Sequence, residues 1–347
     1  MMTRTGKILS VFAAALLLGL FFCVTPTMAS EPVKLIFDTD IGNDVDDTMA
    51  IAVIHALQNR NECELLAVTI TKDHAYAPPM VDLLNTFYGR PDIPIGVVKN
   101  GVTKEAGKYN VPVYDTLDEK GDRVFKTKIT PEMYANLPDA VTVLRKTLAA
   151  QPDGSVVMVQ VGFSTNLARL LDSPGDEISP LTGMELVQKK VKLLSTMAGA
   201  FVERLANHRE YNIACDVPSA QKMFEKWPTP IVFSGFEIGE TITHPAQSMR
   251  NEYNYVDYHP VKIAYHYYRG LENDQPTFDL TSVLYAVRPD RGYFSLSEPC
   301  DVSFDKDGRT LFKPNPNAKN RYMTVTSEQI AMVREALCEL CSEPPKK

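Results

Sequence analysis

LIFDTDIGNDVDDTMAIAVIHAL, residues 35–57, places five aspartates within ten positions. The stretch begins as an apolar run typical of a buried strand and ends as an apolar run typical of a buried helix. The aspartates lie at the junction between the two runs: Asp38, Asp40, Asp44, Asp46 and Asp47. Carboxylates this close together raise one another's pKa and repel unless a cation neutralises them. The junction therefore needs a chemical explanation as well as a structural one.

The order of strand and then helix recurs along the chain. Helical patterns alternate with apolar strand-like runs at about 33–38, 63–71, 93–98, 155–161, 191–197 and 230–235. This alternation predicts an open, Rossmann-like α/β fold with a mostly parallel central sheet flanked by helices. Ligands of such sheets bind at the carboxyl ends of the strands, where the aspartates lie. Two stretches, about 100–130 and 246–257, are expected to be irregular, and the first is long enough to fold over the sheet edge or the site.

The first 29 residues have the order of a secretory leader. Arg4 and Lys7 precede an apolar run from about residue 8 to residue 24, and small residues lead to a cleavage position after Ala29. We therefore expect a signal peptide at 1–29, a single domain at 30–347, and export to the periplasm or the exterior. The alternative is an uncleaved membrane anchor, because the apolar run is near the lower length limit of a membrane span.

The charge of the chain limits its partners. It carries 43 Asp and Glu against 36 Lys and Arg, a formal net charge of −7 at pH 7. This acidic balance argues against nucleic acid, and against a membrane surface once the leader is removed. The sequence leaves open whether the chain forms a homo-oligomer.

The six cysteines are too sparse for a disulfide framework. Cys338 and Cys341 have CxxC spacing, but they lie in SEQIAMVREALCELC, a run with a helical pattern. Without a second pair, we interpret them as two thiols or one local disulfide and not as a metal site.

Helix capping explains only part of the aspartate cluster. Asp46 and Asp47 open the predicted helix, where acidic residues are favoured as caps and by the helix dipole. Capping does not account for the other three. A hard divalent cation bound by oxygen ligands accounts for all five, and the junction has no His or Cys that would suggest zinc. The spacing does not fit an EF-hand.

At this junction the sequence resembles a known family. DTDIGNDVDD, residues 38–47, is similar to the N-terminal signature of the inosine-uridine type nucleoside hydrolases, in a variant with two extra residues before the final Asp-Asp. The resemblance implies hydrolysis of the N-glycosidic bond of ribonucleosides to ribose and free base, with a calcium-activated water. It implies a structural role for Asp38, and it assigns no role to Asp44, which lies in the insertion.

Three later segments, 156–171, 192–224 and 276–289, match the family in the same order along the chain. The metal ligands implied by the resemblance are Asp40, Asp47, the carbonyl oxygen of Val161, and Asp279. The sugar contacts implied by it are Asp46, Met197, Asn207, Glu210 and Asn212. Taken singly, these residues also have ordinary interpretations as helix caps, turn residues or surface charges. The functional interpretation depends on the four segments occurring together.

The sequence departs from the family pattern in two places. Phe278 stands where many members have a His that protonates a purine leaving group. Phenylalanine cannot donate a proton, although it can stack on a base, so the base preference stays open. After the second strand, Thr71, Lys72 and Asp73 replace a Gly-Asn pair, and one of them is expected to contact the sugar. His74 is either a replacement acid or a solvated loop residue, and a loop histidine favours the second interpretation.

The expected mechanism uses Asp40 as a general base that orients the attacking water. Two alternatives stay open at the level of the sequence. One is an exported nucleoside- or sugar-binding protein without turnover, in which chemistry was lost with the missing His. The other is a haloacid-dehalogenase-like phosphatase, whose first strand also ends in Asp-x-Asp, although Ile41, Gly42 and Asn43 do not fit that motif.

Overall fold

The structure, a computed structural model, describes residues 31–346. The expected signal peptide and its cleavage position lie outside this range. Within residues 31–346, no helix combines the length and the hydrophobicity that crossing a membrane requires.

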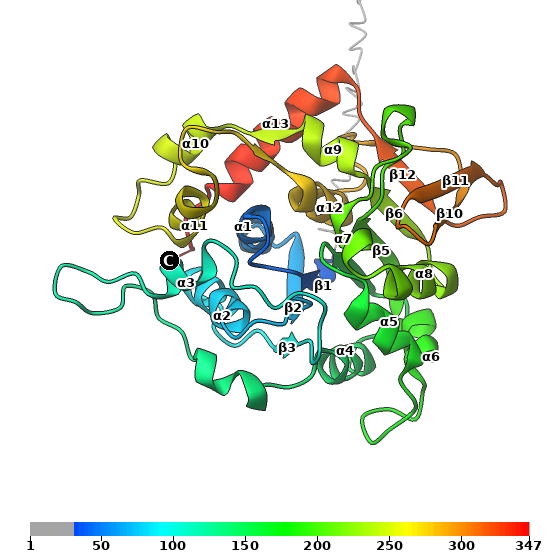
Figure 1. Cartoon of the computed structure of the whole chain (residues 1–347), viewed down its shortest axis with the longest axis horizontal. Coiled ribbons are helices and arrows are strands. Elements are labelled where there is room, and N and C mark those ends of the chain that lie inside the picture. The colour runs from blue at the N-terminus through cyan, green and yellow to red at the C-terminus, as the bar shows by residue number, and fades with distance from the viewer. Residues whose placement is uncertain (1–30, 347) are drawn as a thin grey trace, which may run out of the picture. The chain divides into compact units, whose positions relative to one another are not determined.

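An eight-stranded sheet forms the centre of the fold, with the order β3-β2-β1-β4-β5-β6-β12-β9 (Figure 1). Its strands are β1 (Val33–Thr39), β2 (Cys63–Ile70), β3 (Ile95–Val97), β4 (Val156–Gln160), β5 (Val191–Met197), β6 (Ile231–Ser234), β12 (Arg321–Thr324) and β9 (Ser295–Leu296). Neighbouring strands are parallel except for β12 and β9, which are antiparallel. The predicted fold class is confirmed, and the six predicted strand-like runs coincide with β1 to β6 to within about one or two residues.

Helices cover both faces of the sheet (Figure 1). One apolar layer contains α1 (Asp46–Asn59), α2 (Ala77–Phe87), α11 (Pro260–Arg269), α12 (Phe278–Val287) and α13 (Ser327–Cys341). The other contains α4 (Ala140–Ala149), α5 (Thr165–Asp172), α6 (Gly183–Lys190) and α8 (Val217–Lys226). Strand β1 supplies both layers, because Leu35 and Phe37 lie in the first and Ile36 in the second. Alternate side chains of a strand point to opposite faces, so β1 is buried on both sides.

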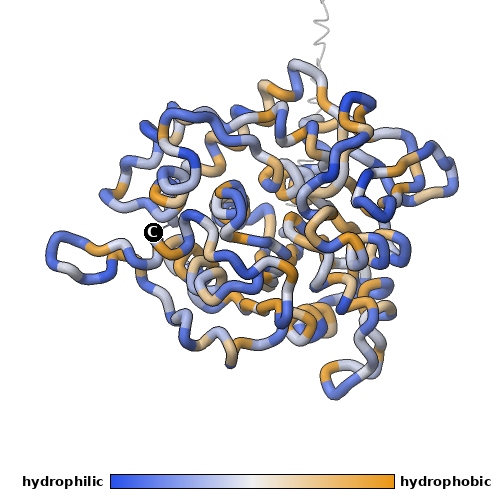
Figure 2. Tube along the Cα trace, in the orientation of Figure 1, coloured by the Kyte–Doolittle hydropathy of each residue, from blue (hydrophilic) through white to orange (hydrophobic). Residues whose placement is uncertain are grey.

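Short elements complete the chain. They are α3 (Asn110–Tyr114), η1 (Pro131–Asn136), η2 (Glu203–Leu205), α7 (Tyr211–Cys215), α9 (Phe236–Thr241), α10 (Ala246–Asn251) and the strand pairs β7 (Thr243–His244) with β8 (Gln275–Pro276) and β10 (Cys300–Phe304) with β11 (Thr310–Pro314). The prediction of an irregular stretch at 246–257 was wrong for its first half, which forms α10. Stretch 100–130 contains only α3 and otherwise runs as loop, and its outer part is mostly hydrophilic (Figure 2).

The strand order places the site. The chain runs from β1 to β2 and β3 on one side, and then returns to β4 on the other side of β1. The connection that leaves β1 therefore runs toward β2, and the connection that leaves β4 runs the opposite way, toward β5. Ligands of open α/β sheets bind at the carboxyl ends of two strands whose connections separate in this way. Asp38 is in register with Gln160, so Asp40 and Val161 follow two adjacent strand ends.

The cysteines follow the first of the two interpretations given above. Cys338 and Cys341 are both free, as are the three other cysteines of the described range. Cys341 is buried among the apolar residues of α1 and α13. The CxxC pair is therefore two thiols in the last helix.

Candidate active site

The turn between β1 and α1 is held by the long loop that precedes α3. The hydroxyl of buried Tyr109 accepts the Gly42 N–H at 2.7 Å and donates to the Asp44 carbonyl at 2.7 Å. Gly42 has φ of +120°, and a Cβ there would lie 2.5 Å from Asn110 Nδ2. A side chain at position 42 would therefore be strained and would displace the side chain of Asn110, the first residue of α3. The prediction that this loop folds over the site is consistent with these contacts.

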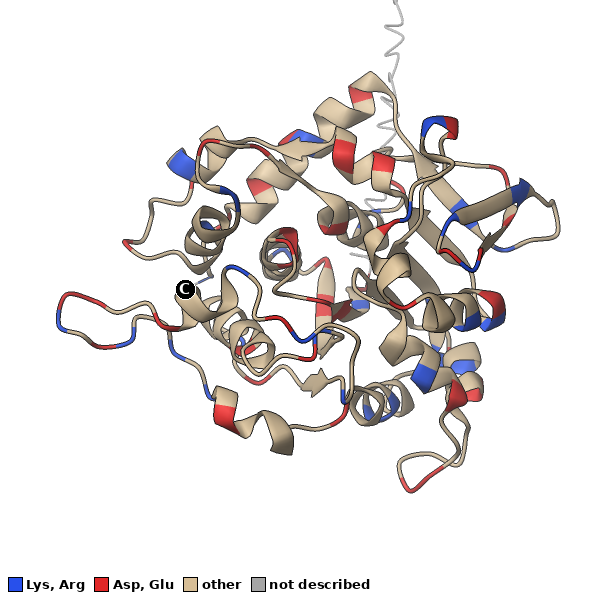
Figure 3. Cartoon of the chain, in the orientation of Figure 1, with Lys and Arg blue, Asp and Glu red and all other residues tan. Residues whose placement is uncertain are grey.

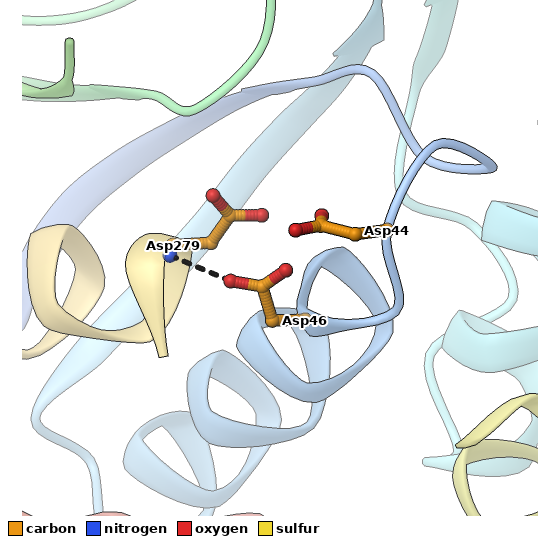
Figure 4. Close-up of side chains that lie close together, drawn as sticks. All are labelled: Asp44, Asp46 and Asp279. Atoms are coloured by element: carbon orange, nitrogen blue, oxygen red, sulfur yellow. Dashed lines mark hydrogen bonds between the residues drawn. The ribbon is translucent and has the colours of Figure 1, made fainter. Parts of the chain in front are cut away.

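Carboxylates from the two ends of the chain meet at this turn. The Asp279 N–H, at the start of α12, donates to Asp46 Oδ2 at 3.0 Å. The side chains of Asp44, Asp46 and Asp279 point toward one another, each with an oxygen within 4.8 Å of the others (Figure 4). Acidic residues at the start of α1 are also visible in Figure 3, whereas most Lys and Arg lie on outer helices and loops. This tight trio shares only Asp279 with the metal ligands implied by the sequence.

Several of these carboxylate oxygens are buried and unpaired. Asp46 Oδ1, Asp47 Oδ2 and Asp279 Oδ2 have no hydrogen-bond partner among residues 31–346. The second oxygen of Asp47 accepts a hydrogen bond from Thr39 Oγ1. Buried polar atoms are normally satisfied, so these unpaired carboxylate oxygens fit a site for a cation.

Burial of the aspartates also raises their pKa values. Burial raises the pKa of Asp40 to about 7 and that of Asp46 to about 6. Burial, followed by repulsion from neighbouring aspartates, raises the pKa of Asp47 and Asp279 well above the usual range. The donors are all oxygens, a set that suits a hard divalent cation such as Ca²⁺. The residues present therefore fit the metal that the sequence implies.

A cavity of about 420 Å³ opens beside the cluster. The predicted site residues that line it are Asp40, Val161, Met197, Glu210, Asn212, Phe278 and Asp279. Asp46 and Asp47 are fully buried next to it. The volume lies in the range of small-molecule sites, which is about 300–1,000 Å³.

Two of the predicted sugar contacts are fixed by backbone groups. Glu210 precedes α7, and its carboxylate accepts the N–H groups of Asn212 at 2.8 Å and Ile213 at 3.3 Å. Burial raises the pKa of Glu210 to about 7. Asn212 Nδ2 donates to the carbonyl of Val161 at 2.8 Å and to that of Met197 at 3.3 Å. The carbonyl expected to bind metal and the amide expected to bind sugar are thus in direct contact.

Asn207 is the predicted sugar contact that the structure leaves outside the cavity. Its side chain is exposed, and it is not among the residues lining the cavity. The backbone of Arg209 forms an isolated antiparallel β-bridge with that of Arg309. The segment before Glu210 therefore runs along the turn between β10 and β11. We therefore omit Asn207 from the site.

The segment after β2 also lies outside the cavity lining. The hydroxyl of Thr71 accepts the Phe163 N–H at 3.2 Å, and Asp73 accepts the Gly101 N–H at 2.9 Å. The Nδ1 atom of His74 accepts the N–H of Tyr76 at 3.3 Å. The expected sugar contact from this segment is therefore not seen, and His74 is not placed to protonate a leaving group.

Aromatic residues form one wall of the cavity. The ring of Phe278 stacks on Phe236, with centroids 5.1 Å apart and planes at 27°. The backbone at Gly239 packs closely against Phe278. A Cβ at position 239 would lie 2.3 Å from Phe278 Cδ1, so glycine is needed for this packing. Phe236 follows β6 directly after Gly235, and its position after a strand end is the sequence signal that could have identified it. Four other lining residues were also missed: Asn43, Lys108, Tyr211 and Tyr268.

Comparison with protein families identifies the chain. The model of the family described as "Inosine-uridine preferring nucleoside hydrolase" matches residues 35–334. The chain belongs to this family, and by class it is an N-ribosyl hydrolase, a glycosidase that acts on nucleosides. The phosphatase alternative is therefore wrong. No curated protein matches the sequence.

Solved structures share the fold at low sequence identity. A plant nucleoside hydrolase is 19% identical with a TM-score of 0.65, over 90% of this chain and 100% of that one. A purine-preferring ribonucleoside hydrolase from Gardnerella vaginalis is 17% identical with a TM-score of 0.62, over 89% of this chain and 99% of that one. An inosine-uridine preferring nucleoside hydrolase from Bacillus anthracis gives the same four values. At these identities the likeness establishes the fold.

Proposed function

We propose that this N-ribosyl hydrolase cleaves ribonucleosides to ribose and free base with Ca²⁺ as its resident cofactor. The observation that carries the proposal is the set of buried, unpaired carboxylate oxygens on Asp46, Asp47 and Asp279 beside a cavity of nucleoside size. Acids contributed by both ends of the chain would not be held so close together without a cation to offset their repulsion.

The proposed ligands are the carboxylates of Asp40, Asp47 and Asp279 and the carbonyl oxygen of Val161. Ca²⁺ bound there would lower the pKa of a water molecule and would bind vicinal hydroxyl groups of a sugar. The amide of Asn212 now contacts the Val161 carbonyl, which has a second lone pair available. Asp44 lies beside Asp46 and Asp279 and adds further negative charge to the site.

The protein's own groups have distinct roles in the proposed reaction. Asp40 lines the cavity and would accept a proton from the attacking water as a general base. Asp46, Glu210 and Asn212 would hold the sugar hydroxyls, which fixes the anomeric carbon relative to Asp40. Cleavage passes through an oxocarbenium-like transition state, and the surrounding carboxylates would stabilise its positive charge.

The aromatic wall is the proposed subsite for the base. Phe236 and Phe278 present apolar faces on which a purine or pyrimidine can stack. Phe278 cannot protonate a leaving base, so we expect slow turnover of nucleosides that depend on leaving-group protonation. The base preference is thus set by stacking and by the intrinsic stability of the departing base.

We further propose that the protein is exported after removal of residues 1–29. The support is the order of charged, apolar and small residues in that segment. N-terminal sequencing of the protein recovered outside the cytoplasm is expected to begin at Ser30. Recovery of the intact N-terminus in a membrane fraction would instead establish the anchor.

A reducing-sugar assay tests the proposed function. The purified exported chain is incubated with inosine, uridine, cytidine and adenosine, with and without a chelator and with Ca²⁺ restored. We expect sugar release that the chelator abolishes and Ca²⁺ recovers. Nucleoside binding without sugar release would contradict the proposal and support a binding protein that has lost turnover.

A further inference from the structure

Lys72 is a buried cation next to the aspartate cluster that the reaction described above does not use. Its side chain is 1% exposed, and its Nζ donates to Asn43 Oδ1 at 2.6 Å. A longer contact of 3.3 Å joins Nζ to Glu105 Oε2, which lies on the loop before α3 and is 74% exposed. Lysine side chains normally extend their charge to solvent, so burial of this one requires compensation.

Asn43 links this cation to the general base. Its Nδ2 donates to Asp40 Oδ2 at 2.6 Å, and Asn43 itself lines the cavity. A lysine ammonium group can only donate hydrogen bonds, so the amide of Asn43 must turn its oxygen toward Lys72. The amide NH₂ is then left facing Asp40. Lys72 and the Asp40 carboxylate therefore require the same amide orientation, and Lys72 holds the Asn43 side chain from the side opposite Asp40.

The alternative amide orientation would change the contact with Asp40. With the amide reversed, Asn43 Oδ1 would face a carboxylate oxygen, and two acceptors at hydrogen-bond distance repel each other. Asp40 therefore excludes the reversed amide, and what the loss of Lys72 removes is the second contact that fixes Asn43 in place, so that Asn43 and the Asp40 carboxylate bonded to it can shift together. A shift of about 1 Å in a reacting group is enough to reduce the rate about 100-fold.

We propose that Lys72 is a positioning residue that acts through Asn43 to orient the Asp40 carboxylate, and that Glu105 holds Lys72 in place from the long loop. The inference rests on the proposed function only in taking Asp40 as the general base. The contact chain from Glu105 through Lys72 and Asn43 to Asp40 is a feature of the folded chain itself. Since none of Thr71, Lys72 and Asp73 lines the cavity, we expect the effect to appear in kcat and not in KM.

Kinetics of four variants tests the proposal: Lys72→Met, Asn43→Ala, the double variant, and Lys104→Met as control. Lys104 lies on the same loop as Glu105 and is 70% exposed, and its Nζ is 4.0 Å from Asp73 Oδ2. Loss of a supporting contact to a metal-site residue costs about 10–100-fold in activity. We expect kcat to fall by this factor in Lys72→Met and Asn43→Ala, with KM unchanged in Lys72→Met, whose side chain lies outside the cavity lining.

The double variant separates positioning from general destabilisation. If Lys72 acts through Asn43, the double variant loses no more activity than either single variant, whereas independent losses multiply. Lys104→Met keeps the wild-type kcat. Wild-type kcat in Lys72→Met, or multiplied losses in the double variant, would overturn the inference.

Crystal structures of Lys72→Met and Lys104→Met give a readout that does not depend on activity. In Lys72→Met we expect the Asp40 carboxylate to leave the position in which it accepts from Asn43, and in Lys104→Met we expect it to stay. An unmoved Asp40 in Lys72→Met would overturn the inference. If the wild-type chain releases sugar from no nucleoside, the proposed function fails, and these two structures still decide the role of Lys72.

Discussion

At Asp47, one carboxylate oxygen accepts a hydrogen bond from Thr39 and the other has no partner in the described part of the chain. Asp47→Asn keeps the shape of the side chain and removes its charge. Because loss of an outer-sphere partner already costs about 10–100-fold in metal affinity, loss of a direct ligand is expected to weaken Ca²⁺ binding by more than about 100-fold. Titration calorimetry with Ca²⁺ measures this, with exposed Asp153→Asn as the control. Wild-type affinity in Asp47→Asn would remove Asp47 from the metal site.

At Phe278, substitution tests the missing leaving-group acid. Phe278→His places a proton donor at the start of α12, beside Asp279 and the aromatic wall. General acid catalysis typically contributes about 10²–10⁴-fold, so we expect a rise of about 10²-fold in kcat for inosine, at the lower end of that range. Phe278→Leu is the matched control, because it removes the ring and supplies no donor. An equal response of both variants would show that leaving-group protonation does not limit the rate.

Single residues differ in how far the sequence identifies them. Asp40, Asp47 and Asp279 were recognisable because the motif specifies their type and order, and the structure brings all three to one cluster. Lys72 was noted only as an unassigned residue of a loop. Its connection to Asp40 passes through Asn43, and no sequence pattern records a hydrogen bond between two segments 29 residues apart.

Among the elements, the loop before α3 has a measurable structural role. Tyr109→Phe removes the hydroxyl that satisfies the Gly42 N–H and the Asp44 carbonyl. An unsatisfied buried group costs about 1–3 kcal/mol, so we expect the free energy of unfolding to fall by that amount and Ca²⁺ binding to weaken. Urea unfolding checks the first effect and calorimetry the second. Exposed Tyr267→Phe is the control, and equal stability of the two variants would contradict a supporting role for this loop.

Elements were predictable where their periodic signal was long. The strands β1 to β6 and the helix α13 were recognisable because apolar residues recur at the strand or helix period over five or more positions in most of them. The strands β9 and β12 were missed because, unlike the equally short β3 and β6, they are not part of a continuous apolar run. Helix α10, also short, follows Pro245 and was hidden in a stretch without clear amphipathic pattern.

For the molecule as a whole, metal, protons and stability are linked. In the metal-free protein, burial raises the pKa of Asp40 to about 7 and of Asp46 to about 6, above the value near 3.9 of an unfolded chain. The folded state then binds more protons than the unfolded state, so this contribution to stability is present at low pH and is lost as the pH rises from about 4 to about 7. Saturating Ca²⁺ keeps the carboxylates ionised and reverses the sign.

Calorimetric melting at pH 5 and pH 7 tests this linkage. We expect the Ca²⁺-induced rise in Tm to be larger at pH 7 than at pH 5, and ligand at 100 times its Kd adds about 2.7 kcal/mol of stability. In Asp279→Asn the Ca²⁺-induced rise should shrink at both pH values. A Ca²⁺ effect that is independent of pH would contradict the coupling of protons and metal.

The arrangement of the whole chain was predictable only in class. The alternation of strands and helices predicts a parallel sheet, and the sequence motif places acids at its carboxyl edge. The order of the strands, with β1 between β2 and β4, depends on long-range packing that no local pattern specifies. It is this order that sets Asp40 beside Val161 and lets α12 bring Asp279 to Asp46.

Anomalous diffraction from crystals of the exported chain grown with Ca²⁺ tests most directly whether the two ends of the chain share one cation. We predict a single strong peak within coordination distance of Asp40, Asp47, Asp279 and the Val161 carbonyl, at about 2.3–2.6 Å from their oxygens. The absence of a peak between these oxygens, at a Ca²⁺ concentration that supports sugar release, would contradict the proposed site.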